Sequence, residues 1–242
     1  MKKMAKKTSG HKEAWKVWGD VFDQFTEVTM QRLISQRRLA GLISPLKIGK
    51  EANVFLGRGA PDEVLVVKIY RLTTCDFNKM YDYMKGDPRF GSLVKKRRKV
   101  IFLWTQREYR NLLMAHEAGI RCPVPHAIRN NVLVMDLIGK DGQPAQQLKQ
   151  QPPKNPKKFF EEVVKMMRKL HKAKLVHGDL SEYNILNNDE LPVFIDMSQA
   201  TVYENPNWMM YMDRDCHNIA KYFAKLGVDT SDEKLKAMIL ND

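Results

Sequence analysis

Cysteine is scarce in this sequence, and several other class-defining features are missing. Cys75, Cys122 and Cys216 are far apart, odd in number and form no C-x-x-C pair. Their spacing argues against a disulfide framework or a zinc cluster and favours reduced thiols. No apolar run is long enough to cross a membrane, and the lysine-rich start is not followed by the apolar segment of a signal peptide. We therefore expect a cytoplasmic protein with no membrane partner.

Acidic residues are also in deficit. The chain has 28 Asp and Glu against 41 Lys and Arg, which gives a net charge of +13 and a pI near 9.6. Such a surplus suits a polyanionic partner, most simply RNA, because phosphate contacts release counterions. The alternative is charge that serves only solubility. Residues 1–10 are expected to be a basic tail.

The length allows one good core or two small lobes. With 242 residues and 43% hydrophobic side chains, the composition is that of an ordinary globular protein. No internal repeat is present. A repeat architecture is therefore not expected.

The most informative stretch is 175–186, where apolar residues flank a polar centre. Within it Asp179 and Asn184 are five residues apart, an order found in the loop H-x-D-x-x-x-x-N that accepts a hydroxyl proton and holds a metal. A second apolar segment, 193–195, ends at Asp196, which places another carboxylate beside them across a turn at 187–190. The pattern predicts a phosphoryl-transfer site, with a solvated polar loop as the alternative.

A lysine and a glutamate each interrupt an apolar pattern upstream. Segments 50–57 and 63–69 are predicted strands of a hairpin, and Lys68 lies inside the second. Between residues 100 and 119, Glu108 falls in the middle of one helical face with four apolar neighbours. Each charge needs a partner if it is buried, so we expect the two to pair. The alternative is that both extend to the surface.

The remaining segments are mostly helical or irregular. The pattern over 13–42 predicts two amphipathic helices, the second over 28–40 ending at Gly41, with Trp15, Trp18, Phe22 and Phe25 docking them. Residues 71–99 form a partly mobile insertion that ends in the basic run 95–99. A hairpin is expected over 126–138, a loop or irregular helix over 143–154, a helix from Pro156 to residue 173, and core helices over 208–212 and 219–226.

Three separated motifs together resemble the RIO family of atypical kinases, and most closely its first subgroup. They are G-K-E-A-N-V at 49–54, H-G-D-L-S-E-Y-N-I-L at 177–186 and I-D-M-S-Q-A at 195–200. The resemblance covers about residues 25–242. It implies an α+β fold, a trimmed two-lobed protein kinase with a helical N-terminal extension. The expected parts are the tail and extension over 1–43, a β-rich N-lobe over 44–138 with the 71–99 insertion, and a helical C-lobe over 139–242.

The resemblance also implies roles for individual residues. Asp179 would be the catalytic base, Asn184 and Asp196 would hold Mg²⁺ (or Mn²⁺), and Lys68, set by Glu108, would bind the phosphates of ATP. Asp196 would also become transiently phosphorylated during ATP hydrolysis. The ATP-binding set adds two segments. The phosphate loop contributes Lys47, Gly49, Lys50, Glu51, Ala52 and Val54, and the hinge between the lobes contributes Asp136 and Ile138 after the gatekeeper Met135.

The sequence departs from conventional kinases at three points. Only one glycine of the phosphate loop remains, because Lys47 and Ala52 occupy the other glycine places. Lys47-Ile48 replaces the Ser-Thr usual in the subgroup, so Lys47 can substitute for a hydroxyl contact to phosphate. D-M-S stands in place of D-F-G, and no A-P-E segment is present. A platform for peptide substrates is therefore not expected.

These observations predict an ATP- and Mg²⁺-dependent serine/threonine kinase or ATPase. Members of the resembled family mature the small ribosomal subunit, so its precursor particle and rRNA are the expected partners. The alternatives are a small-molecule kinase of the aminoglycoside or choline type, the small kinase of the threonylcarbamoyl-tRNA complex, and a non-catalytic RNA-binding scaffold on a kinase fold. The physiological protein substrate and the oligomeric state are left open.

Overall fold

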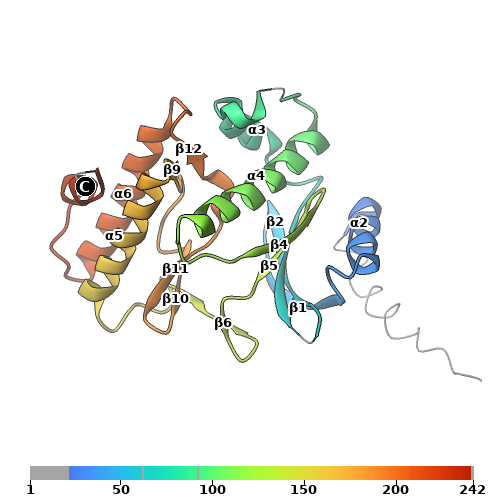
Figure 1. Ribbon diagram of the computed structural model, residues 1–242, viewed down its shortest axis with the longest axis horizontal. Helices are drawn as coiled ribbons and strands as arrows, with labels where there is room; N and C mark the ends of the chain where they lie inside the picture. The colour runs from blue at the N-terminus through green and yellow to red at the C-terminus, as the bar shows by residue number, and fades with distance from the viewer. Residues whose placement is uncertain (1–21, 62, 92, 241–242) are drawn as a thin grey trace, which may run out of the picture.

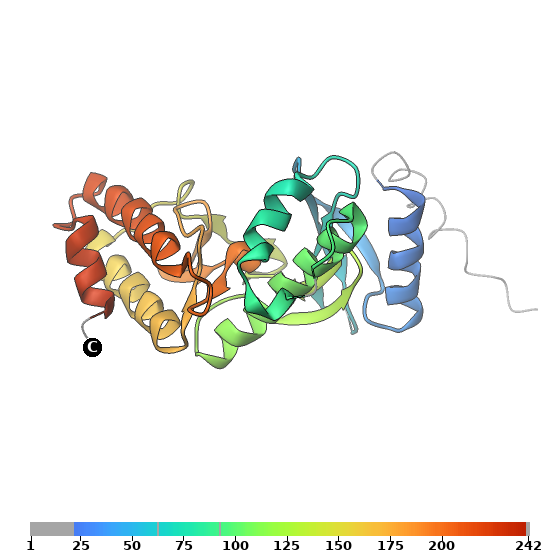
Figure 2. The ribbon, with the colours of Figure 1, turned by 90° about the horizontal axis from the view of Figure 1, so that it is seen from above.

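The computed structural model describes residues 22–61, 63–91 and 93–240. A lobe built on a five-stranded sheet and a lobe built on helices lie side by side (Figure 1). Seen from above, helix α2 (Gln24–Ser35) is at one end of the elongated molecule and the C-terminal helices are at the other (Figure 2). The mixed α+β, two-lobed fold predicted from the sequence is confirmed.

The sheet is antiparallel, with strand order β1-β2-β3-β5-β4. Its strands are β1 (Gly41–Ile48), β2 (Ala52–Arg58), β3 (Val64–Tyr70), β4 (Pro125–Arg129) and β5 (Val132–Asp136). Strand β3 is central and almost wholly buried, as expected for an apolar run in the middle of a sheet. Both predicted hairpins, β2–β3 and β4–β5, are present.

Helix α2 covers one face of the sheet, where Met30 and Leu33 pack against residues that include Phe55. Asp23 caps it by accepting from the backbone N–H of Thr26. The helix predicted over 28–40 begins earlier and ends at Ser35, because Gly41 to Ile48 pairs with β2 instead. Helical periodicity could not reveal this pairing. The first predicted helix, with Trp15 and Trp18, lies outside the described residues.

Helix α4 (Arg97–Glu117) lies on the other side of the sheet from α2 in both views. The predicted buried face is confirmed, with Glu108 enclosed among apolar residues. The 71–99 segment before it contains helix α3 (Phe77–Lys85) and the short turn η1 (Pro88–Phe90). Met80 and Met84 are buried there in a cluster that includes Val100 and Trp104 of α4, so the insertion packs on that helix.

The second lobe contains helices α5 (Pro156–Lys172), α6 (Trp208–Lys225) and α7 (Asp232–Leu240). Asn155 caps α5 with Pro156 at its first turn, as predicted. The segments 208–212 and 219–226 belong to the single helix α6, and the prediction that the first is core is wrong for Met209 and Met210, which are exposed.

Short strands flank the loops that contain Asp179 and Asp196. The predicted hairpin is present as β10 (Ile185–Asn188) and β11 (Leu191–Phe194). Strand β8 (Gln146–Gln147) pairs with β10, so the stretch 143–154, predicted as a loop or irregular helix, begins with short strands and is otherwise irregular. Strand β12 pairs with β9 on the helical side. The strands are β6 (Gly139–Lys140), β7 (Gln143–Pro144), β8 (Gln146–Gln147), β9 (Leu175–Val176), β10 (Ile185–Asn188), β11 (Leu191–Phe194) and β12 (Thr201–Val202).

No helix among the described residues has the length and hydrophobicity that a membrane crossing requires.

Candidate active site

The site is built around the Lys68 ammonium in the middle of β3. Its Nζ donates to Glu108 Oε1 at 2.7 Å and to Asp196 Oδ1 at 2.9 Å. Glu108 is 1% exposed, and its second oxygen accepts from the Tyr70 hydroxyl at 2.6 Å. The expected Lys68–Glu108 pair is therefore present, and each oxygen of this buried glutamate has a donor.

Burial and charge act in opposite directions on this cluster. Burial lowers the pKa of Lys68, but the carboxylates of Asp196 and Glu108 outweigh it and hold that pKa well above its ordinary value. Burial would raise the pKa of Asp196, but the Lys68 ammonium and the Ser198 hydroxyl bring it down to about 2. At neutral pH Asp196 is therefore a carboxylate and Lys68 a cation.

Asp196 is held in a left-handed backbone conformation, with φ 58° and ψ 64°. This region is sparsely populated by residues other than glycine and is often found at functional sites. Its carboxylate accepts from the Ser198 hydroxyl at 2.7 Å, and its side chain remains 41% exposed. The ionised carboxylate of Asp196 is thus fixed in direction and still accessible to a metal ion.

Helix α4 also holds the turn η2 (Met197–Gln199) that follows Asp196. Asn111 donates to the backbone carbonyls of Met197 and Ala200 at 2.8 and 2.7 Å. Arg107, fully buried, donates to the Ala200 carbonyl at 3.2 Å. The helix that carries Glu108 therefore also positions the loop of Asp196.

The loop after β9 brings Asp179 and Asn184 together. The Asn184 amide nitrogen donates to the backbone carbonyl of Asp179 at 2.8 Å and to its Oδ2 at 3.1 Å. Gly178 has φ +79°, and a Cβ there would lie 2.9 Å from the Gln199 carbonyl, so this turn requires glycine. Burial and the negative charge of Asp196 raise the pKa of Asp179, which makes it a better proton acceptor.

His177 supports the loop as a neutral imidazole. It is 1% exposed, and burial lowers its pKa to about 4. Its Nε2 lies 3.0 Å from the Ile195 carbonyl, which can only accept, so Nε2 carries the proton. This bond joins the loop of Asp179 to the strand that delivers Asp196.

Asp215 on α6 also holds the loop of Asp179 in place. Its role was not predicted from the sequence. Its two carboxylate oxygens accept from the backbone N–H groups of Gly178 and Leu180, both at 2.8 Å. Burial raises its pKa to about 7 in spite of these bonds. The signal was available, because Asp215 is a lone acid on the buried face of an amphipathic helix, as Glu108 is.

A cleft of about 510 Å³ opens beside these groups, within the size range of small-molecule sites. Leu46, Val54 and Val66 of the sheet lobe face it, and so do Leu186 and Ile195 of the other lobe. The end of β5 and the segment after it also line the cleft. There the Asp136 N–H donates to the Val124 carbonyl, and the Ile138 carbonyl accepts from the Ala145 N–H.

Most of the predicted site residues line this cleft: Lys47, Val54, Lys68, Glu108, Met135, Asp136, Ile138, Asn184 and Asp196. Gly49, Lys50, Glu51 and Ala52 lie at the β1–β2 turn and are not among its lining residues, and neither is Asp179, which contacts Asn184. Their roles stay predictions. Three lining glutamines, Gln146, Gln147 and Gln150, were not predicted, because a polar loop sequence carries no signal of facing a site.

The oxygen donors at the cleft fit a hard divalent cation. Asp196 offers an accessible carboxylate, and Asn184 uses its amide nitrogen on Asp179, which leaves its amide oxygen for another contact. Carboxylate and amide oxygens are ligands that Mg²⁺ accepts. The residues present therefore suit a hard divalent cation, and the Lys68 ammonium beside them suits an anionic ligand.

Comparison with known proteins agrees with this geometry. The model of the RIO domain family matches residues 53–235. The Rio1 serine/threonine-protein kinases of Haloferax volcanii and Methanocaldococcus jannaschii are 39% and 42% identical, over 95% and 90% of this chain and 79% and 74% of their own. Human RIO1 is 32% identical over 86% of this chain and 38% of its own length.

A solved structure shares the fold. The Rio2 kinase of Chaetomium thermophilum, in an ADP/Mg²⁺–phosphoaspartate complex, superposes with a TM-score of 0.68 at 22% identity, over 87% of this chain and 64% of that one. The family match covers most of the sequence and contains Lys68, Glu108, Asp179 and Asp196. This chain therefore belongs to the RIO family of serine/threonine-protein kinases.

Proposed function

We propose that this chain binds ATP with Mg²⁺ in the cleft and transfers or hydrolyses the γ-phosphoryl group. The observation that carries the proposal is the contact of one buried ammonium, Lys68, with both Glu108 and Asp196 at the edge of the cleft. A fixed cation next to an ionised metal-binding carboxylate is what phosphoryl transfer requires, since its catalysis is mainly positioning and charge stabilisation.

Some of the lining residues would contact the adenine ring of ATP, and others would contact its phosphates. The adenine would meet the backbone of Asp136 and Ile138 beside Met135; the Asp136 N–H is already bonded, so its carbonyl is the group left for the base. Lys68 would contact the α- and β-phosphates. Asn184 and Asp196 would hold Mg²⁺, or Mn²⁺ in its place, which supplies charge neutralisation at the phosphates.

Lys47 would extend the phosphate contacts from the sheet side. It lies in β1, is exposed, and lines the cleft. Gly49, Lys50, Glu51 and Ala52 would shape the turn above the phosphates, where the Gly49 N–H donates to the Ala52 carbonyl at 3.1 Å. A lysine at this place replaces a neutral hydroxyl contact with a charged one.

Asp179 would accept the proton of the attacking hydroxyl group. Its raised pKa supports this role, and its bond to Asn184 fixes the carboxylate beside the metal-binding residue. In transfer, a serine oxygen forms the new P–O bond, the bond to ADP breaks, and the proton goes to Asp179. Serine residues of this chain or of a protein substrate would be the acceptors.

Asp196 would act as the phosphoryl acceptor in hydrolysis. Its carboxylate oxygen would attack the γ-phosphorus, ADP would leave, and water, giving its proton to Asp179, would then cleave the acyl phosphate to release inorganic phosphate. The low pKa of Asp196 supports this role, since the ionised form is the nucleophile. The Rio2 kinase of Chaetomium thermophilum, which shares this fold, has been solved as a complex with ADP/Mg²⁺ and a phosphoaspartate.

The charge of the chain supports an RNA partner, and we propose the precursor of the small ribosomal subunit in the cytoplasm. The basic run 95–99 at the start of α4 is exposed. Its Arg97 is tied to the Thr73 and Cys75 carbonyls, whereas its lysines are not in ion pairs within the described ranges. A non-catalytic scaffold would need no such assembled site.

Replacing Asp179 with Asn should lower ATP turnover by about 10²–10⁴-fold, because the general base is lost while the shape is kept. The measurement is the initial rate of ADP release at saturating Mg²⁺ and ATP. Asp189→Asn, which changes an exposed turn carboxylate, is the matched control and should keep the wild-type rate. Equal and feeble turnover by the wild type and Asp179→Asn would remove the enzymatic assignment.

Exposure to ATP should leave a phosphoryl group on Asp196. The trapped species should be cleaved by hydroxylamine, as an acyl phosphate is, and borohydride reduction should convert residue 196 to homoserine in the mass spectrum. The wild-type chain is used, so no variant has to fold. If only hydroxylamine-stable phosphoserine is found, Asp196 is not the acceptor.

Binding to small-subunit rRNA should weaken steeply with salt, because lysine–phosphate contacts release counterions. Changing Lys95, Lys96 and Lys99 together to Gln should reduce the slope of log K against log salt by about 2–3. The triple Gln variant at Lys154, Lys157 and Lys158 removes the same charge from exposed positions of the other lobe and should keep the slope. A flat salt dependence in the wild type would contradict the RNA proposal.

A further inference from the structure

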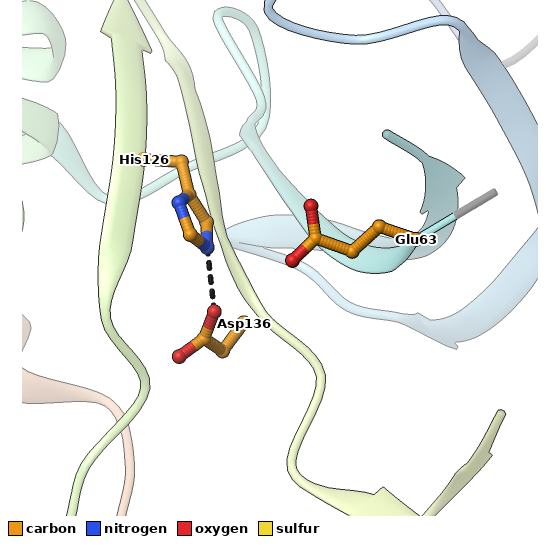
Figure 3. A group of neighbouring side chains, drawn as sticks. All are labelled: Glu63, His126 and Asp136. Carbon is orange, nitrogen blue, oxygen red and sulfur yellow. Dashed lines mark hydrogen bonds and ion pairs between the residues drawn. The ribbon is translucent and has the colours of Figure 1, made fainter. Parts of the chain in front are cut away.

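The side chains of Glu63, His126 and Asp136, three potential metal ligands, lie close together where β5 leads into the hinge (Figure 3). One atom of each, a carboxylate oxygen or a ring nitrogen, lies within 4.8 Å of the other two. His126 Nε2 and Asp136 Oδ1 are 2.5 Å apart. The proposed nucleotide chemistry uses the backbone of Asp136 but none of these three side chains.

The sheet itself brings the three residues together. Asp136 ends β5 and pairs in register with Leu65 of β3, two residues after Glu63. His126 lies in β4, which pairs with β5 on its other side. The second oxygen of Asp136 accepts from the Val124 N–H at 3.1 Å, which orients the carboxylate. Asp136 and His126 therefore lie on paired strands, His126 at a break in the register, whereas Glu63 immediately precedes β3 and is held less firmly.

The local charge also favours a cation. Although the chain carries a net charge of +13, neither Glu63 nor Asp136 pairs with a lysine or arginine among the residues that the structure describes. Two carboxylates this close repel each other when both are ionised. A divalent cation between them would remove that repulsion and use the imidazole as a third ligand.

We propose that Glu63, His126 and Asp136 bind a transition-metal cation of the Zn²⁺ class, with water completing the coordination. A tetrahedral site with bonds of about 2.0–2.1 Å places its ligand atoms roughly 3.3 Å apart. The widest separation, which is within 4.8 Å, has to close by at most about 1.5 Å, and the His126–Asp136 contact of 2.5 Å has to open by about 0.8 Å. Glu63 is exposed, so it is free to move. The metal takes the Nε2 lone pair, and the ring proton sits on Nδ1.

The ligand set separates this site from the magnesium position in the cleft. Imidazole nitrogen suits zinc and related metals, whereas Mg²⁺ prefers oxygen and keeps its water. The site would tie the beginning of β3 to the end of β5, the strand that leads into the hinge. It does not depend on nucleotide binding, so its failure would leave the proposed function untouched.

The test titrates the full chain, free of any histidine tag, with Zn²⁺ against a chromogenic chelator. We expect one saturable site per chain, weakened at least about tenfold in His126→Ala and in Glu63→Gln, with Mg²⁺ unable to compete. In ¹⁵N NMR, Zn²⁺ should shift the His126 Nε2 signal. Melting curves in excess chelator, equal for all variants, establish that the substitutions leave the fold intact.

His217→Ala is the matched control, because His217 is also exposed and also contacts one carboxylate, Asp232 at 2.8 Å, but has no third ligand among the residues that the structure describes. It should bind Zn²⁺ as tightly as the wild type. Two results would overturn the proposal: an isotherm for His126→Ala that matches the wild type, or an equal loss in His217→Ala. Either would leave an exposed His–Asp hydrogen bond and no metal site.

Discussion

The pairing of one buried ammonium with two carboxylates is the constraint on which this molecule depends. Lys68 belongs to the sheet lobe, Glu108 to the helix beside it, and Asp196 to a loop of the helical lobe. A buried ion that loses its partner costs several kcal/mol. The buried Lys68 ammonium is therefore stabilised by one acid from each lobe, and all three residues line the cleft between the lobes.

Helix α4 transmits this constraint to the rest of the site. Glu108 and Asn111 lie one turn apart, the first bound to Lys68 and the second to the carbonyls of the turn after Asp196. The left-handed backbone of Asp196 is kept by these bonds, since local strain persists only where the surroundings overdetermine it. From the other side, Asp215 fixes the loop of Asp179 through two backbone N–H groups.

The predictable parts of the site were those in which a charge interrupts an apolar pattern or a motif sets the spacing. Lys68 and Glu108 were found in this way, and the same reasoning would have found Asp215 had it been applied to 208–226. The cleft glutamines and the support from Asn111 could not be found, because nothing in a polar loop or a helix face shows which distant carbonyl it meets.

The fold was predictable where local patterns decide it. The hairpins, the cap at Asn155 and the buried face of α4 all follow from short-range signals. The boundary at Gly41 could not be predicted, because residues 41–48 become a strand only by pairing with β2. The merging of two segments into α6 was missed because the polar residues 213–218 interrupt the apolar pattern, and the exposure of Met209 and Met210 was missed because they look like core residues in the sequence. Tertiary pairing and exposure are not local properties.

The most direct measurement is a crystal structure of this chain with Mg²⁺ and a non-hydrolysable ATP analogue. The account predicts that the metal is coordinated by Asn184 and Asp196. It also predicts that the Lys68 ammonium keeps its contact with Glu108 while it binds an α- or β-phosphate oxygen. A nucleotide bound elsewhere, or one whose phosphates and metal touch none of Lys68, Asn184 and Asp196, would contradict it.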